Sequence, residues 1–535
     1  MADFNAFVII FLIIFIIWLP QAIYQILVWS YWWQVKEYRL DRFWIFLKTA
    51  DGRQKLGLNI IILKFIVLVF SFIYIPISLL LFFYQDLILI KDLFQKRARK
   101  PVITKRINKI YITGFFGIVL TIFAFYFLGF RRALLLGEFA LILTPYVGIL
   151  WTIPIVKRVK KEEIQKAKAV LSKIKPTVIG ITGSYGKTTT KEFVAHLLSQ
   201  KFITAKTEGS ENTEFGIARK TQKNVFNGTK FFVVEMGAYK KGEIRKLADI
   251  VNPSIGIITG IEEQHLSLFG SLQDIKDAKY ELIESLPKEG IALFNLTNEY
   301  CRGLYQKARQ ANNSWKILGY YAGQKRINFN EKPDIVLTPV KISSAGCEFE
   351  LEYENENKRF YAPIKGLHLL QNLAAAILVA RQFGLSWKMI KRGIETLVMP
   401  EGTMNVYRIK NNVLVIDDSR NSNPSAFSSA LDYLSLIEGK KKVVITNGII
   451  ELGDSSDYIH FRLGKEMKHS IDKILLTNKD FYESFKKGLG KYIYKLVLID
   501  ERFALKNIEK ILTEGNCVVL LEGRLPSLLT QKFKN

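Results

Sequence analysis

The sequence predicts an α/β protein that is preceded by a helical transmembrane region. Three observations support this fold class. After residue 176, short β-branched runs alternate with amphipathic helical stretches up to the C-terminus, which is the pattern of parallel α/β domains. Residues 177–198 are typical of a buried strand, a glycine turn and a helix. Before residue 156, apolar stretches are long enough to cross a hydrocarbon core of about 30 Å.

The N-terminal region, residues 1–156, is expected to contain about four membrane segments. They are residues 7–31, 58–90, 110–130 and 133–155. Only residues 130–132 separate the last two segments, so these two are expected to form a helical hairpin. Lys and Arg concentrate in residues 36–55, 91–109 and 157–161. Because basic loops stay on the cytoplasmic side, the domains that follow are expected in the cytoplasm.

The charge and the cysteines limit the classes of partner. The formal net charge of +27 comes from 76 Lys and Arg against 49 Asp and Glu. Much of the basic excess flanks the apolar segments, which indicates a lipid bilayer as partner and no nucleic acid. Cys301, Cys347 and Cys517 share no metal-ligand spacing and cannot form a multi-disulfide framework. We therefore expect a multi-pass protein of a bacterial-type cytoplasmic membrane.

Residues 182–190 read T-G-S-Y-G-K-T-T-T and lie between the predicted strand 177–181 and the predicted helix 191–198. A glycine turn before a helix N-terminus places backbone N–H groups around an anion. We expect Lys187 to reach the terminal phosphates of ATP and the Thr188 hydroxyl to ligate Mg²⁺. The spacing G-x-x-G-K-T is shorter than the common G-x-x-x-x-G-K-[ST]. The predicted nucleotide contacts in this loop are Gly183, Ser184, Gly186, Lys187, Thr188 and Thr189.

A second hydrophobic strand is predicted at residues 231–235, F-F-V-V-E, and it ends in Glu235. A carboxylate at the end of a strand beside the phosphate-loop strand would face the same edge of a parallel sheet. Carboxylate oxygens are ligands that Mg²⁺ accepts. Glu235 is therefore the second residue that we expect to be directed at the metal.

The shortened phosphate loop resembles that of the Mur ligase family, and further elements of that family follow in order. Residues 212–216 (N-T-E-F-G) resemble a substrate loop with the usual form N-N-E-I-G. The other matching segments are 265–272 (H-L-S-L-F-G-S-L), 278–279 (A-K), 366–375 (G-L-H-L-L-Q-N-L-A-A), 416–424 (I-D-D-S-R-N-S-N-P) and 448–453 (G-I-I-E-L-G). They are similar to the D-alanyl-D-alanine-adding ligases of peptidoglycan synthesis.

The resemblance implies a phosphate-loop Mur ligase central domain at residues 176–400 and a Rossmann-like C-terminal domain at residues 401–535, after a basic linker at 157–175. It implies that Mg²⁺ is held by Thr188, Glu235, His265 and Lys279, with Lys279 as a carbamate. Further nucleotide contacts would be His368, Asn372 and Asp418. Substrate contacts would be Asn212, Thr213, Asn421, Asn423 and Glu451. The catalytic group would be Lys187, Lys279, His265 and Arg420, which stands where relatives place a lysine or a tyrosine.

The implied function is that of a membrane-anchored, ATP-dependent amide ligase. A carboxylate would be activated as an acyl phosphate and joined to the amine of an amino acid or dipeptide. Membrane helices stand where soluble relatives carry a uridine-nucleotide-binding domain. The acceptor is therefore expected to be a cell-wall precursor, either nucleotide-linked or lipid-linked.

Two other functions stay open. One is a polyglutamate-synthase-like ligase, which also combines a membrane segment with a Mur-type loop, although the elements at 416–424 and 448–453 argue against it. The other is a non-catalytic ATP-binding membrane scaffold. It is motivated by departures from the family pattern, namely Leu369 in place of Asn, Thr403 in place of Arg, and N-L-T-N at 295–298.

Overall fold

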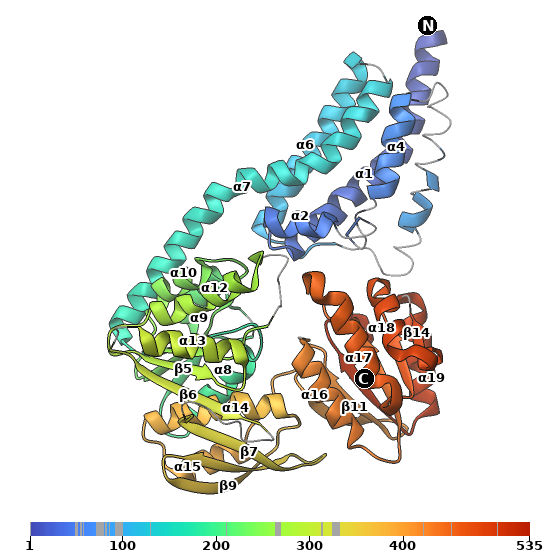
Figure 1. The fold of residues 1–535 in the computed structure, drawn as a ribbon. Helices are drawn as coiled ribbons and strands as arrows, with labels where there is room; N and C mark the ends of the chain where they lie inside the picture. The colour runs from blue at the N-terminus through green and yellow to red at the C-terminus, as the bar shows by residue number, and fades with distance from the viewer. Residues whose placement is uncertain are drawn as a thin grey trace. The chain divides into compact units, whose positions relative to one another are not determined.

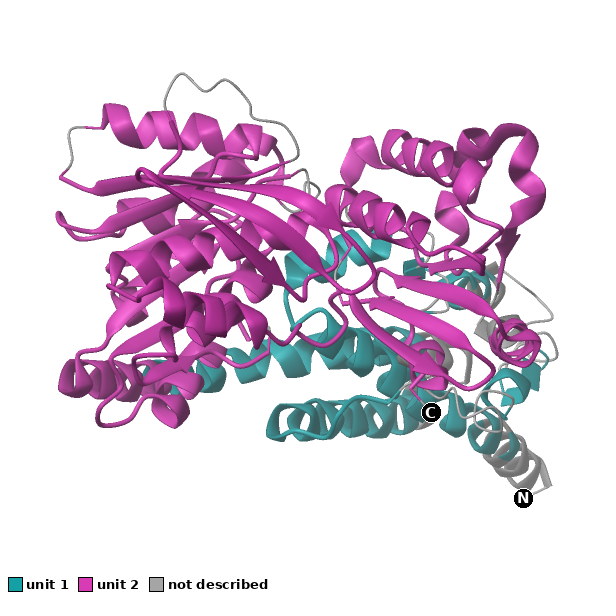
Figure 2. Cartoon of the chain, turned by 90° about the horizontal axis from the view of Figure 1, so that it is seen from below, with its two compact units in different colours: residues 1–161 teal, residues 162–535 magenta. Residues whose placement is uncertain are grey.

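The computed structural model describes residues 2–48, 52–53, 56, 58–70, 80, 83–84, 86–90, 100–128, 130–209, 211–262, 269–311, 314–323, 332–420, 422–450, 452–499 and 501–534. The chain forms two compact units, residues 1–161 and residues 162–535, which Figure 2 shows in two colours. Each unit is described separately below.

The first unit is helical. Its helices are α1 (Ala2–Val35), α2 (Leu40–Lys48), α4 (Leu58–Phe70), α6 (Lys105–Leu128) and α7 (Phe130–Ile174), the last of which continues into the second unit. Among the described residues, two helical stretches are long and apolar enough to cross a membrane, Lys105–Ala124 and Leu136–Ile174. Most of the predicted segment 58–90 beyond Phe70 lies outside the described residues.

Helices α6 and α7 pack closely through small residues. A Cβ on Gly117 would lie 2.5 Å from Thr144 Cγ2, and a Cβ on Gly148 would lie 3.0 Å from Ile110 Cα. The later residue of one helix therefore meets the earlier residue of the other, so the pair is antiparallel. Glycine at such a contact lets two apolar helices approach closely. The predicted basic linker 157–175 is helical, because α7 continues to Ile174.

The second unit contains a nine-stranded sheet and a six-stranded sheet. The order of the first is β2-β3-β1-β4-β5-β6-β7-β8-β9, and its neighbouring strands are parallel except that β8 runs antiparallel to both β7 and β9. Its strands are β1 (Thr177–Thr182), β2 (Thr204–Lys206), β3 (Phe231–Glu235), β4 (Ile255–Ile258), β5 (Ile291–Asn295), β6 (Lys316–Ala322), β7 (Ile335–Ile342), β8 (Cys347–Tyr353) and β9 (Glu356–Ala362). Its helices are α8 (Lys187–Leu198), α9 (Glu214–Asn224), α10 (Glu243–Val251), α12 (Leu272–Glu284), α13 (Glu299–Gln310), α14 (Leu367–Gln382) and α15 (Trp387–Glu395).

Helices cover both faces of the nine-stranded sheet, as Figure 1 shows. The alternate residues Ile179 and Ile181 pack under α8 and α14, whereas Val178 faces the side of α10, α12 and α13. Strand β1 lies between β3 and β4, where the strand order reverses. In open parallel sheets ligands bind at the carboxyl ends of strands at such a reversal. The fold therefore places the phosphate loop, which follows β1, at the ligand-binding edge.

The six-stranded sheet has the order β10-β11-β15-β12-β13-β14, with only β10 antiparallel. Its strands are β10 (Asn405–Ile409), β11 (Val413–Asp418), β12 (Lys441–Thr446), β13 (Lys473–Leu476), β14 (Leu496–Leu498) and β15 (Cys517–Glu522). Its helices are α16 (Pro424–Ser435), α17 (Ser456–Ser470), α18 (Tyr482–Leu489), α19 (Glu501–Glu514) and α20 (Ser527–Lys532), with the 3₁₀ turns η1 (Gly453–Ser455), η2 (Lys479–Phe481) and η3 (Gly490–Lys495). The predicted α/β fold class is confirmed.

Candidate active site

The phosphate loop joins β1 to α8 in a turn that depends on glycine. Gly186 has a φ of +76°, and a Cβ at this position would lie 2.6 Å from Asn372 Oδ1. Helix α8 consequently begins at Lys187, before the predicted residue 191, because the left-handed Gly186 ends the turn. Lys187 Nζ donates to the carbonyl oxygens of Gly183 at 2.7 Å and Ser184 at 3.2 Å. The ammonium thus lies over the anion-binding turn.

Protein contacts fix the rest of this loop. The Ser184 amide donates to Gly260 O at 2.7 Å, and Ser184 Oγ lies 3.2 Å from both the backbone oxygen and nitrogen of Glu262. The Tyr185 hydroxyl accepts from Asn298 Nδ2 at 3.2 Å, and burial raises the pKa of this tyrosine. The loop therefore has a preformed conformation, which is what a phosphate cradle requires.

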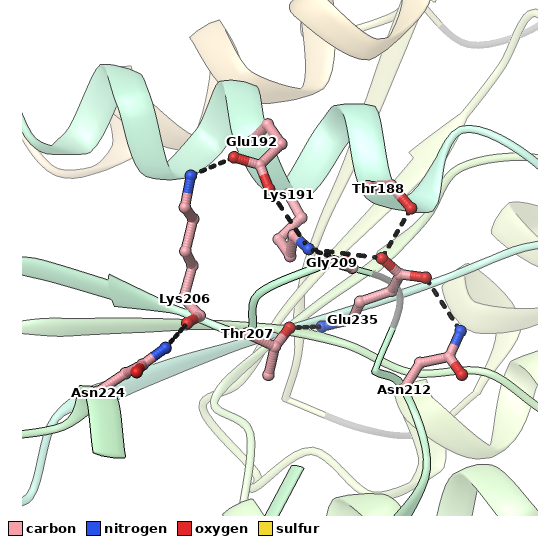
Figure 3. A network of polar contacts seen from close by, with 9 residues as sticks. All are labelled: Thr188, Lys191, Glu192, Lys206, Thr207, Gly209, Asn212, Asn224 and Glu235. Atoms are coloured by element: carbon pink, nitrogen blue, oxygen red, sulfur yellow. Dashed lines mark hydrogen bonds and ion pairs between the residues drawn. The ribbon is translucent and has the colours of Figure 1, made fainter. Parts of the chain in front are cut away.

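Glu235 lies at the carboxyl end of β3 with 2% of its surface exposed. Its Oε2 accepts from Thr188 Oγ1 at 2.8 Å and its Oε1 accepts from Asn212 Nδ2 at 3.0 Å, as drawn in Figure 3. A threonine hydroxyl and a carboxylate at this point are hard oxygen donors, and Mg²⁺ needs few protein ligands when phosphates supply the others. These residues therefore fit Mg²⁺. Thr213, predicted as a substrate contact, caps α9 by accepting from Gly216 N at 3.3 Å.

Lys279 is a buried lysine of α12, with 3% of its surface exposed. Its Nζ lies 3.5 Å from Ala238 O and 5.4 Å from the centre of the Phe269 ring. Burial, assisted by the positive charge of Lys187, lowers the pKa of Lys279 to about 7. A large share of this amine is therefore neutral at physiological pH, which is the form that reacts with carbon dioxide. The predicted partner His265 lies outside the described residues, as do Asn421 and Glu451.

Helix α14 brings two predicted nucleotide residues to different places. Asn372 lies against the phosphate loop, where its Oδ1 accepts from Thr190 Oγ1 at 3.2 Å. His368 is partly buried, and burial lowers its pKa to about 4. Its Nδ1 has no hydrogen-bond partner among the described residues. His368 is therefore a neutral imidazole with one ring nitrogen able to bond to a ligand.

Two buried carboxylates lie side by side in the six-stranded sheet. The parallel register pairs Asp418, at the end of β11, with Glu522, at the end of β15. Asp418 Oδ1 accepts from Met404 N at 3.1 Å, and Glu522 Oε1 accepts from Ser422 Oγ at 2.6 Å. Burial raises the pKa of Asp418 to about 7 and raises the pKa of Glu522 well above its usual range, where the charge of Asp418 adds to the effect. The pair therefore retains protons at pH values where exposed carboxylates have lost them.

The first turn of α16, which follows β11, contacts the segment that binds the phosphate loop. Ser425 Oγ donates to Glu262 Oε1 at 2.6 Å, and the backbone of Glu262 binds Ser184 as described above. Asn423, predicted as a substrate contact, caps α16 by accepting from Ala426 N at 3.0 Å. The Arg420 amide donates to Gly402 O at 3.1 Å.

Three charged residues near these positions were not predicted. Lys191 lies one helical turn after Lys187, and this spacing of four residues is the only sequence signal for it. Glu522 and Arg524 lie far from the motifs in sequence. The charge of Arg524 lowers the pKa of Lys187, after the larger effect of burial and against the opposite effect of Glu235. No sequence pattern near Arg524 predicts its electrostatic interaction with Lys187.

Comparisons with known proteins agree with this arrangement. Residues 181–380 match the Mur ligase middle domain. The chain is 31% identical to the UDP-N-acetylmuramoyl-tripeptide--D-alanyl-D-alanine ligase of Synechocystis sp. over 305 residues. This alignment covers 57% of this chain and 62% of that relative. The chain is 27% identical to the ligase of the same name from Escherichia coli, over 66% of this chain and 75% of the relative. The chain thus spans less than two-thirds of the length of the Synechocystis relative.

Solved structures give the same result. MurF from Acinetobacter baumannii is similar with a TM-score of 0.61 and 26% identity, over 70% of this chain and 80% of that chain. MurF ligase from Thermotoga maritima in complex with ADP has a TM-score of 0.57 and 25% identity, over 70% of this chain and 84% of that chain. The chain therefore has the α/β Mur ligase fold, and its residues 181–380 are similar to the middle domain of the Mur ligase family.

Proposed function

We propose that this chain is an ATP-dependent carbon–nitrogen ligase that activates a carboxylate as an acyl phosphate and joins it to an amine in the synthesis of peptidoglycan precursors. One observation carries this proposal. The Thr188 hydroxyl and the Glu235 carboxylate meet at 2.8 Å beside a preformed phosphate loop whose lysine lies over the anion-binding turn. This arrangement suits the binding of a nucleotide triphosphate with a metal ion.

The residues of the site have distinct tasks in this reaction. The substrate carboxylate attacks the γ-phosphorus of ATP, the new O–P bond forms, and the bond from that phosphorus to the bridging oxygen breaks to release ADP. The Lys187 ammonium and the first amides of α8 would neutralise the transferred phosphate. The amine then attacks the acyl carbon, the new C–N bond forms, and the C–O bond to phosphate breaks. The amine gives its proton to solvent, and inorganic phosphate leaves. Arg420 would add positive charge where the phosphate departs.

Thr188 and Glu235 would hold Mg²⁺, which supplies electrostatic stabilisation of the phosphate oxygens when bound. Lys279 would serve as a carbamate. Its neutral amine attacks carbon dioxide, a C–N bond forms, and one proton is released to solvent. The low pKa of about 7 favours this step, since an ordinary lysine is almost fully protonated at neutral pH. Asn372 and Asp418 would contact the nucleotide.

The names of the relatives suggest the substrates. We assign a UDP-N-acetylmuramoyl-tripeptide, or a lipid-linked form of the same muramoyl peptide, as the acceptor and D-alanyl-D-alanine as the amine. Asn212 and Thr213 would lie on the acceptor side. This assignment is supported by the likeness of residues 212–216 to the substrate loop of these ligases.

The first unit would anchor the ligase in a membrane with several passes. Two helical stretches have the required length and composition. Most exposed large apolar side chains of the described residues also belong to the first unit, for example Phe115, Phe116, Leu120 and Phe123 on α6. Large exposed apolar surfaces are rare in proteins that meet only water. A lipid-facing role accounts for them.

The test is Mg²⁺-dependent phosphate release by the detergent-purified full chain. UDP-muramoyl tripeptide and its lipid-linked counterpart are each supplied with D-alanyl-D-alanine, and the amide product is identified by mass. Lys187→Ala is the inactive control, and Lys206→Ala, an exposed lysine of the same domain, is the matched active control. Turnover with either acceptor supports the proposal, and turnover with the lipid form alone supports membrane anchoring as part of substrate selection. The proposed function would be refuted if no amide above background formed with either acceptor.

A further inference from the structure

Lys191 is a lysine whose side chain has no exposed surface. It lies on α8, one turn after Lys187, and its Nζ donates to Gly209 O at 2.6 Å. The same Nζ lies 3.4 Å from Glu192 Oε1 and 3.6 Å from Glu235 Oε2, as Figure 3 shows. A buried ammonium is costly unless acceptors surround it, and here three acceptors do so.

Two of these acceptors belong to different parts of the site. Glu235 is the carboxylate that we assign to Mg²⁺. Gly209 belongs to the segment between β2 and α9, of which the structure describes residues 207–209 and 211–212; this segment is named the 207–212 loop below. Lys191 therefore joins the metal-directed carboxylate to the loop that carries the proposed acceptor contacts.

Further hydrogen bonds fasten the same loop to Glu235. Thr207 Oγ1 accepts from Glu235 N at 3.1 Å at one end of the loop, and Asn212 Nδ2 donates to Glu235 Oε1 at 3.0 Å at the other. Gly209 has a φ of +59°, and a Cβ there would have no neighbour within 4 Å. No side chain packs at Gly209 itself, and its carbonyl is held by Lys191, while the neighbouring Glu208 is held separately by Lys220 at 2.7 Å.

A divalent cation that binds Thr188 and Glu235 would change the electrostatic interaction between Lys191 and Glu235. The cation and the Lys191 ammonium would both interact with the Glu235 carboxylate. Two positive charges in a buried site also repel each other, so the cation weakens the Lys191–Glu235 contact. Any weakening of the Lys191–Glu235 contact is transmitted to Gly209, because the same nitrogen donates to its carbonyl. The position of the loop thus depends on the cation through Lys191 Nζ, in addition to the direct hydrogen bond from Asn212 to Glu235.

We propose that Lys191 is a positioning residue that couples the 207–212 loop to occupancy of the metal site, holding the loop against Glu235 until a cation takes over the carboxylate. The proposal rests on the proposed function only in its use of Mg²⁺ and nucleotide at the phosphate loop. In the ligase reaction, it makes acceptor binding respond to the metal and nucleotide that bind first.

Lys206 provides a matched control in the same network. It pairs with Glu192 from β2, as Lys191 does from α8, but 41% of its side chain is exposed and it contacts neither Glu235 nor Gly209 in the described structure. A role limited to neutralising Glu192 would make the two lysines equivalent. A coupling role makes only Lys191 matter to the loop.

The experiment measures hydrogen–deuterium exchange of the loop amides in the full chain, with and without MgCl₂ in the presence of ADP. It compares the unmodified chain with Lys191→Met, Lys191→Arg and Lys206→Met. In the unmodified chain we expect exchange at 207–212 to change when Mg²⁺ is added. In Lys191→Met we expect exchange about tenfold faster, which corresponds to ~1.4 kcal/mol, with a smaller further response to Mg²⁺ than in the unmodified chain. Lys191→Arg should restore part of the response, and Lys206→Met should behave as the unmodified chain.

A second readout is the Mg²⁺ concentration at half-saturation, followed by the thermal shift of the ADP complex. Removing the competing ammonium should lower this midpoint several-fold in Lys191→Met. Should that variant fail to fold, Lys191→Gln keeps a donor for Gly209 without the charge, and the same lowered midpoint is expected. An Mg²⁺ response of the loop that is equal in Lys191→Met and the unmodified chain, or equally lost in Lys206→Met, overturns the proposal.

Neither readout needs turnover. A chain that shows the coupling but joins no substrate would refute the proposed function and leave the coupling in place. A chain that joins substrates while its loop ignores Mg²⁺ would refute the coupling alone.

Discussion

Replacing Glu522 by Gln should stabilise the six-stranded domain at high pH and have little effect at low pH. Glu522 and Asp418 are 0% and 4% exposed and face each other across β15 and β11. Among the described residues, no lysine or arginine forms an ion pair with either carboxylate. Gln keeps the size of the side chain, can still accept from Ser422, and can donate from its amide to Asp418. It removes one of two charges that must otherwise be buried together.

The sign of the effect follows from the raised pKa of Glu522, and the neighbouring Asp418 indicates its scale. The pKa of Asp418 rises from 3.8 to about 7 in the folded chain, and each unit of pKa corresponds to about 1.4 kcal/mol. Between these two pH values the folded state binds more protons than the unfolded state, so stability falls as pH rises. For Asp418, which both proteins contain, the loss that accumulates by pH 8 is of the order of 4 kcal/mol as an upper limit, and it gives the scale of the burial penalty that Gln removes at the neighbouring Glu522. Glu522 shifts in the same direction.

The assay is the melting temperature of the detergent-purified chain and its Glu522→Gln variant at a series of pH values from 5 to 8. The difference between the two proteins cancels the groups that titrate in both. We expect the variant to melt several degrees higher at pH 8, since about 1 kcal/mol shifts a domain of this size by several degrees. Glu514→Gln, an exposed glutamate of α19, should show no such pH dependence. A difference that stays constant, or that favours the unmodified chain as pH rises, would refute the reasoning.

Four further outcomes are expected. Lys187→Ala should lower phosphate release by at least about 100-fold, because it removes the charge over the phosphate turn. Gly186→Ala should weaken ADP binding measured by calorimetry, since φ is +76° and the new Cβ would lie 2.6 Å from Asn372 Oδ1. With ¹³C-bicarbonate, a carbamate resonance should appear above about pH 7, vanish in Lys279→Ala and persist in Lys276→Ala. Gly148→Leu should lower the melting temperature in detergent, because overpacking the α6–α7 contact costs about 1–3 kcal/mol.

The parts of the molecule that could be predicted are those encoded in short segments. The strand, glycine turn and helix at 177–198 identified the phosphate loop because a turn with these glycines has few other uses. Glu235 was predicted as metal-directed because a strand end has a known place in a parallel sheet, and the structure brings it to Thr188 at 2.8 Å. The α/β fold class followed from the same alternation of strands and helices.

The residues that could not be predicted depend on contacts between distant segments. Asp418 and Glu522 are 104 positions apart, and only the order β11-β15-β12 makes them neighbours. In the sequence Lys191 is an ordinary helical lysine, and only the structure shows its hydrogen bond to Gly209 of the 207–212 loop. Asn212, Thr213 and Asn423 were predicted as substrate contacts from their segments alone. In this structure their side chains bond to Glu235 or cap helices, so their contact with substrate remains a prediction.

The two sheets of the second unit compensate the charge of buried carboxylates in different ways. Each buries at least one carboxylate at the carboxyl end of a parallel strand, where a ligand is expected. In the central domain the charge of Glu235 is met by the Lys191 ammonium and two neutral donors. In the C-terminal domain Asp418 and Glu522 retain protons instead. Because an ammonium is displaced by a cation whereas a proton is released by rising pH, the central domain should respond to Mg²⁺ and the C-terminal domain to pH.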